Sequence, residues 1–321
     1  MPNRLSIFSS RLLASGVAWT AVAVFCIESW CWKTLPSKYF SHEVDILLYD
    51  LQTRTYDADT IVLGDSVGRQ LSRYLAGQKK CDFIPLATNG AVEMAGQYYI
   101  LIRYLERNRP PSAVILLKHH VLHGDMKRVT TENYLQRCFT RWYEMLSMTW
   151  QSQSPSFGLR MLSYRLAAAK YRLHLQKLIP GLPPPETGGN ARQVEERLEV
   201  LEKTPPLQQL MKRLFPSDLN SISEYYFIRL LSLCQQRNIR IYYLPCPMTN
   251  STWTRYKCGV AYARLVRRLQ ELSEDFPVLT YTTEIKDYPN GWFEDGIHIS
   301  AEKLPVVADD YSRLMTELMR Q

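Results

Sequence analysis

Short apolar segments alternate with longer amphipathic ones over most of the chain, and this alternation restricts the fold more than any other feature. The segments that predict strands are 60–63, 83–86, 113–117, 239–244 and 278–281. The segments that predict helices are 66–76, 92–107, 221–236, 258–273 and 301–319. Strands alternating with helices of this length predict an α/β fold, in which helices cover both faces of a parallel sheet to give three layers. The functional residues of such a sheet are expected at the carboxyl ends of its strands.

One long segment, residues 130–216, interrupts the alternation and is predicted to be a helical insertion. Between Arg137 and Lys177 it carries seven basic side chains and one acidic side chain, Glu144. Two interpretations stay open. The insertion is either a helical cap whose charges are solvated, or a basic surface that meets anionic head groups or an acidic polymer.

The start of the chain is strongly apolar. Residues 12–32 contain one charged side chain, Glu28, and they match the roughly 20 residues that span a bilayer. The expected organisation is a short tail, a transmembrane anchor, a polar connector and one folded domain: 1–11, 12–32, 33–57 and 58–321. This order predicts a domain outside the cytoplasm, in the periplasm or at the cell surface. A signal peptide cleaved at Ala21-Val22-Ala23 is the alternative.

The composition is basic and contains few cysteines. The chain has 39 Lys and Arg residues against 31 Asp and Glu residues, a formal net charge of +8. This excess suits an anionic partner such as phospholipid head groups or an acidic glycan. Nucleic acid is disfavoured because no binding motif is visible. The 7 cysteines are too few for a disulfide scaffold, but Cys246 and Cys258 could pair in an oxidising compartment.

Two short motifs carry the candidate chemistry. Ser66 directly follows an expected buried strand and opens a helix, a position that exposes its hydroxyl at the carboxyl edge of the sheet. Asp295 and His298 lie three residues apart in the turn before the last helix. One loop can thus present a carboxylate and an imidazole together, so that Asp295 orients His298 and His298 takes the proton of Ser66.

These motifs carry a family resemblance. Residues 61–66 (IVLGDS) resemble the first sequence block of the SGNH (GDSL-type) hydrolase superfamily, and residues 295–300 (DGIHIS) resemble its last block. The resemblance implies a flavodoxin-like fold, the SGNH hydrolase fold, without a cofactor or metal. It also implies the catalytic roles: Ser66 as nucleophile, His298 as base and Asp295 as the partner that orients the base.

The resemblance further implies an oxyanion hole formed by the N–H groups of Ser66 and Gly90, because Asn89-Gly90 matches the second block of the family. The third block of the family supplies an asparagine, and this chain has Lys118-His119-His120 in its place. We expect a histidine to replace the missing asparagine as a polar contact. Asn89, His119 and His120 are therefore the expected substrate contacts.

Membrane-anchored members of this superfamily share the order of an anchor followed by an SGNH domain. They include the alginate O-acetylation proteins and the D-alanyl transfer protein of teichoic acid. The resemblance implies an O-acyltransferase or esterase that acts on an extracytoplasmic glycan or other acylated polymer, at the membrane and with a multi-pass membrane acyltransferase as partner. The choice between hydrolysis and transfer stays open. The alternative is a catalytically silent subunit that binds glycan or scaffolds a membrane polysaccharide complex.

Two competing motifs are disfavoured. Residues 64–68 match the G-x-S-x-G nucleophile elbow of α/β-hydrolases, but that elbow follows several strands, whereas one strand fits between the anchor and Ser66. A second cluster, comprising His119, His120, His123 and Asp125, follows the third expected strand. A metal site is disfavoured there because the carboxylates and the spacing of common zinc motifs are missing.

Overall fold

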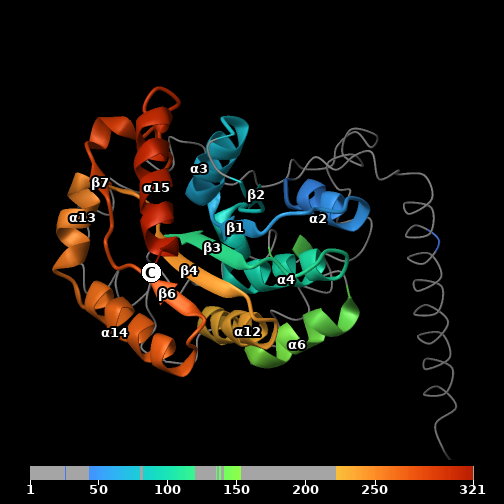
Figure 1. Ribbon diagram of the computed structural model, residues 1–321. Coiled ribbons are helices and arrows are strands. Elements are labelled where there is room, and N and C mark those ends of the chain that lie inside the picture. Colours follow the sequence, from blue (N-terminus) through green and yellow to red (C-terminus); the bar gives the residue numbers. More distant parts are fainter. Residues whose placement is uncertain are drawn as a thin grey trace, which may run out of the picture.

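The computed structural model describes residues 43–79, 82–119, 141–152 and 222–320, together with Cys26, Leu135, Arg137 and Cys138. Within these residues the chain forms an α/β fold around a five-stranded sheet of order β2-β1-β3-β4-β6 (Figure 1). Its strands are β1 (Thr60–Gly64), β2 (Ile84–Pro85), β3 (Ala113–Lys118), β4 (Arg240–Pro245) and β6 (Leu279–Tyr281). All neighbouring strands are parallel, which confirms the predicted α/β class and parallel sheet.

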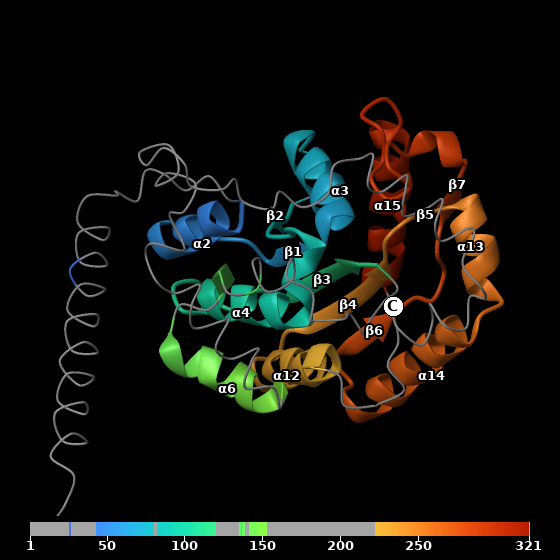
Figure 2. The same cartoon turned by 180° about the vertical axis from the view of Figure 1, so that it is seen from behind.

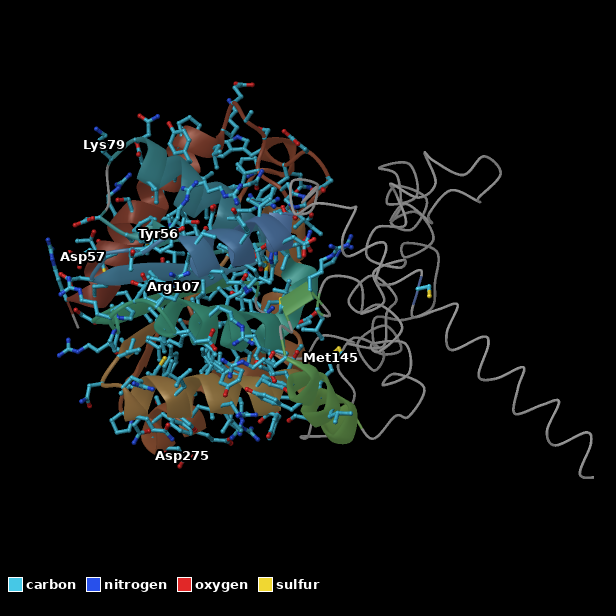
Figure 3. All side chains as sticks on the ribbon, turned by 90° about the vertical axis from the view of Figure 1, so that its right-hand side faces the viewer. Tyr56, Asp57, Lys79, Arg107, Met145 and Asp275 are labelled. Carbon is cyan, nitrogen blue, oxygen red and sulfur yellow. The ribbon has the colours of Figure 1, made fainter. Side chains whose placement is uncertain are left out.

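The register brings the carboxyl ends of the central strands together. Gly64 at the end of β1 lies beside Leu117, and Leu117 lies beside Leu244 on β4. Asp57 shortly precedes β1 and Arg107 lies between α4 and β3, so both belong to the opposite, amino end of the sheet; both are labelled in Figure 3. Side chains that directly follow β1, β3 and β4 therefore share one edge, where a site in a parallel sheet is expected.

Helices cover both faces of the sheet. They are α2 (Glu43–Thr53), α3 (Ser66–Gly77), α4 (Glu93–Leu105), α6 (Trp142–Ser152), α12 (Ile222–Gln236), α14 (Val260–Asp275) and α15 (Leu304–Met319). Figure 1 shows α3 and α15 above the sheet and α4 and α12 below it, and the view from behind in Figure 2 shows the same division.

The strands supply alternate side chains to these two layers. Val62 and Ile115 pack in the core beneath α3 and α15, whereas Ile61 and Leu116 pack in the core that includes α2, α4 and α12. Successive side chains of a strand point to opposite faces, so a sheet covered on both faces requires continuous apolar runs. Met145 on α6, labelled in Figure 3, extends the second core beside α12.

The structure adds elements that the sequence patterns do not predict. Helix α2 falls within the expected polar connector, and it buries Val44, Leu48 and Leu51 against the folded body. These residues repeat at i, i+4 and i+7, one face of a helix. After β4 the chain forms α13 (Asn250–Lys257) and a two-stranded parallel sheet of β5 (Met248–Thr249) and β7 (Asp287–Tyr288).

The predicted anchor and most of the predicted insertion lie outside the described residues. Of residues 12–32 the structure describes Cys26. In the described part of the chain, no helix is long and apolar enough to cross a membrane. At the start of the insertion α6 is helical, as expected. Two basic residues of the insertion precede α6 and form ion pairs. Arg137 pairs with Asp45 on α2, and Arg141 pairs with Glu106, which directly follows α4.

Candidate active site

Ser66 lies in the turn that joins β1 to α3. Gly64 has a φ of +152°, and a Cβ there would lie 1.9 Å from the carbonyl oxygen of Leu117, so this position requires glycine. Asp65 is the N-cap of α3, and its Oδ1 accepts hydrogen bonds from the second and third N–H groups of the helix at 3.0 and 3.2 Å. The Gly-Asp-Ser motif thus ends the strand, caps the helix and leaves Ser66 at the carboxyl edge of the sheet.

Asp65 is also held by the strands beside it. The backbone N–H of His119 donates to its Oδ2 at 2.6 Å and Nδ1 of the same residue lies 2.7 Å from Oδ2, while the Cys246 thiol donates to Oδ1 at 3.4 Å. Burial alone would raise the pKa of Asp65. The charge and hydrogen bonds of His119 and the charge of Lys118 outweigh burial and hold this pKa well below its usual range. The carboxylate is therefore ionised and fixes the turn before Ser66.

His298 is presented by a tight turn that the pairing of Phe293 with Ile299 closes. Asp295 Oδ1 accepts hydrogen bonds from two N–H groups of this turn, at 3.0 and 2.7 Å. Gly296 has a φ of +77°, a backbone conformation that favours glycine. The Asp-Gly-x-His motif therefore supplies both the fold of the turn and its two functional side chains.

The structure brings Ser66, His298 and Asp295 together as one hydrogen-bonded chain. His298 Nε2 lies 2.9 Å from Ser66 Oγ, and His298 Nδ1 lies 2.6 Å from Asp295 Oδ2. Burial raises the pKa of Asp295, but the hydrogen bonds from His298 and Ile297 outweigh it and lower the pKa overall. An ionised Asp295 accepts from Nδ1–H, which leaves Nε2 to accept the proton of the Ser66 hydroxyl.

Two glutamine side chains, which sequence reasoning missed, support this arrangement. Gln70 on α3 exchanges two hydrogen bonds with the backbone of Ile299, one residue after His298. Gln97 on α4 exchanges two hydrogen bonds with the backbone of Gly64, at 3.0 and 2.8 Å. Each amide satisfies both backbone groups of one residue. Together they tie the two sequence motifs to helices on both faces of the sheet.

A pocket of about 310 Å³ opens beside Ser66. Ser66 and Gly90, the expected oxyanion pair, both line it, and neither N–H has an acceptor among the described residues. A Cβ at Gly90 would lie 3.2 Å from the Asp65 Cβ, so a side chain at this position would crowd the turn. A substrate oxygen in this pocket can therefore approach two backbone N–H groups next to the hydroxyl of Ser66.

Two of the three expected substrate contacts lie at the pocket. Asn89 and His119 line the pocket, whereas His120 lies outside the described residues, as do His123 and Asp125 of the disfavoured metal cluster. Asp65, His119 and Cys246 place one potential metal ligand each within 4.8 Å of one another. Because the oxygens of Asp65 are already hydrogen-bonded to the helix and to these two residues, the cluster is explained by the support of the Ser66 turn.

The possible disulfide between Cys246 and Cys258 is not formed, because both residues are free cysteines. Cys246 is fully buried against Asp65, whereas Cys258 is exposed at the end of α13. Burial, followed by the negative charge of Asp65, raises the pKa of the Cys246 thiol well above its usual value. The thiol is therefore protonated and serves as a hydrogen-bond donor to the Asp65 carboxylate.

No protein-family model matches the chain, and no curated protein matches it in sequence. The geometry around Ser66 is therefore the basis for a functional proposal.

Proposed function

We propose that the protein is a serine acyl-ester enzyme of the SGNH type, an esterase or O-acyltransferase. One observation carries the proposal: Ser66, His298 and Asp295 form a continuous hydrogen-bonded chain beside a pocket. Nucleophile, base and orienting carboxylate within hydrogen-bond reach are the arrangement that activates a serine hydroxyl. The α/β fold is consistent with a flavodoxin-like SGNH domain, whose first strand and last loop carry the triad.

The acylation step follows from the positions of these groups. Ser66 Oγ attacks the ester carbonyl carbon while His298 Nε2 takes the hydroxyl proton, and Asp295 stabilises the resulting imidazolium. The negative charge that develops on the carbonyl oxygen is stabilised by the N–H groups of Ser66 and Gly90. When the carbon–oxygen bond of the ester breaks, His298 returns the proton to the leaving oxygen. The product is an acyl group on Ser66 Oγ and a free alcohol.

The second half-reaction decides between the two activities. Water or an acceptor hydroxyl attacks the acyl-enzyme, again with His298 as base, and releases an acid or a new ester.

For the substrate we propose an extracytoplasmic glycan or another acylated polymer, with residues 12–32 as a single membrane anchor. This part of the proposal depends on the apolar sequence of that segment and on the superfamily resemblance. A multi-pass membrane acyltransferase is the proposed partner.

The test is ester hydrolysis by the purified full-length chain in mild detergent, with para-nitrophenyl acetate as substrate. We expect Ser66→Ala to lower the rate by about a thousandfold or more. Asp295→Asn should cause a comparable loss in a folded protein, because the amide would hold His298 in the wrong tautomer. Ser273→Ala, on the surface of α14, serves as the matched control. Activity that survives in Ser66→Ala would reject Ser66 as the nucleophile, whereas a folded wild type without activity would favour the non-catalytic, glycan-binding subunit.

A further inference from the structure

A lysine lies buried beside the proposed nucleophile. Lys118 is the last residue of β3, its side chain is 6% exposed, and it lines the same pocket as Ser66. Its neighbour Leu117 packs in the core beneath α3 and α15. Because successive side chains of a strand alternate, Lys118 points to the opposite face, where α4 begins. The lysine therefore reaches the pocket from the side opposite the core of α3 and α15.

The ammonium group of Lys118 is incompletely satisfied. Its nearest charged partner is Glu93, with 3.6 Å between Nζ and Oε2, which is too long for a hydrogen bond. Among the residues that the structure describes, Nζ donates no hydrogen bond, although an ammonium carries three N–H donors. A buried charge without hydrogen bonds is costly. Within the described residues, the pocket thus contains a cationic donor without a hydrogen-bond acceptor.

Glu93 is positioned by an unusual backbone. It is the first residue of α4 and has a φ of +52°, the left-handed region that residues with a side chain rarely adopt. Its side chain is 14% exposed, lines the pocket, and accepts a hydrogen bond at 3.5 Å from Ser223, which lies near the start of α12. Strained conformations of this kind cluster at active sites and ligand-binding positions. The carboxylate and the ammonium thus face one gap from α4 and β3.

We propose that Lys118 and Glu93 form a subsite for a hydroxyl group of the substrate, next to the ester that Ser66 attacks. One hydroxyl satisfies both residues, because its oxygen accepts from Lys118 Nζ while its proton is donated to the Glu93 carboxylate. A negatively charged substrate group would be attracted by the ammonium of Lys118 but repelled by the carboxylate of Glu93. The subsite therefore selects a neutral, hydroxylated compound such as a sugar that carries an ester beside a free hydroxyl. This inference rests on the proposed function.

The test compares two substrates on the full-length protein: methyl glucoside that carries a single acetyl ester, and para-nitrophenyl acetate, which has no hydroxyl. The measured quantity is the ratio of their kcat/KM values. We expect Lys118→Met to lower this ratio at least about tenfold, because a hydrogen bond to a charged group is lost. Glu93→Gln should also lower it, by a smaller factor. Lys286→Met removes an exposed lysine that pairs with Glu284 and should leave the ratio unchanged.

Three results would overturn the inference. If Lys118→Met lowers kcat/KM equally for both substrates, Lys118 acts on the oxyanion or on the stability of the fold rather than on a substrate hydroxyl. A wild-type kcat/KM that is higher for an acetyl ester of glucuronic acid than for the acetylated methyl glucoside would indicate an anion subsite. An unchanged ratio of the two kcat/KM values in Lys118→Met would show that the hydroxyl subsite does not exist.

If Lys118→Met does not fold, the double variant Lys118→Met/Glu93→Gln, which leaves no buried charge unpaired, is measured in the same way. Failure of the wild type to hydrolyse para-nitrophenyl acetate would instead reject the proposed function.

Discussion

Gln70 and Ile299 join the helix of the proposed nucleophile to the loop of the proposed base. The amide Nε2 of Gln70 donates to the carbonyl oxygen of Ile299, and its Oε1 accepts from the Ile299 N–H, both at 3.2 Å. Ser66 lies four residues before Gln70, and His298 directly precedes Ile299. The distance between Ser66 Oγ and His298 Nε2 therefore depends on this amide, and Gln70 is a positioning residue.

The first prediction follows from this pair. Gln70→Ala should lower kcat for ester hydrolysis about tenfold with little change in KM, because two hydrogen bonds of roughly 0.5–1.5 kcal/mol each no longer hold the loop. Steady-state kinetics with an aryl ester measure this. Gln270→Ala, on the exposed face of α14, is the control. A change in KM with kcat intact would show that Gln70 acts on substrate binding.

The second prediction concerns the backbone of the His298 turn. Gly296→Ala should lower the free energy of unfolding by about 1–2 kcal/mol and slow ester hydrolysis, because an alanine at a φ of +77° is strained. A Cβ at this position meets no atom within 4 Å, so the effect is conformational. A Cβ at Gly291 also meets nothing, and its φ is not positive. Equal thermal stability of Gly291→Ala and Gly296→Ala would contradict the interpretation.

The third prediction concerns the stability of the Ser66 turn at low pH. The pKa of Asp65 is lowered in the folded state, so its contribution to stability is present above the unfolded value of about 3.9 and is lost as the pH falls toward the folded value. Asp65→Asn should therefore be markedly less stable than the wild type at neutral pH, and this difference should shrink below about pH 4. Urea unfolding between pH 3 and 7 measures it. A difference that stays constant over this range would mean that the carboxylate is not ionised.

The fourth prediction concerns the ion pair between Arg103 on α4 and Glu144 on α6. Their side chains are 1% and 5% exposed. Arg103→Met should cost about 3–5 kcal/mol of unfolding free energy, because the buried carboxylate of Glu144 would lose the charge of Arg103. Arg313 forms an exposed pair with Asp310, and Arg313→Met should cost less than about 1 kcal/mol. Similar costs in both variants would show that the buried pair does not hold α6 to the sheet domain.

The sequence predicts the triad because each of its motifs is local. Asp65 and Ser66 require only a strand that turns into a helix, and Asp295 and His298 require only one tight turn. The supporting contacts join residues far apart in the chain. Gln70 and Ile299 are 229 positions apart, and Gln97 lies 33 positions from Gly64. A glutamine in a helix gives no sign of such a partner before the strands are aligned.

Other differences have equally specific causes. Helix α2 is short and lies among polar residues, so the apolar face of Val44, Leu48 and Leu51 is the one signal for it. That signal was sufficient in principle, because the three residues repeat at helical spacing. Lys118 could not be recognised as a buried charge, since burial depends on the register of β3 between β1 and β4. Nor does the sequence predict the strained backbone of Glu93.

The central claim is that Ser66 forms a covalent acyl-enzyme with His298 as base. The most direct measurement is labelling of the full-length protein with a fluorophosphonate, followed by mass spectrometry of the modified peptide. We predict one adduct, on Ser66, that is absent in Ser66→Ala and reduced by about a thousandfold in rate in His298→Ala. A folded wild-type protein that gives no adduct, or an adduct on another serine, would contradict the claim.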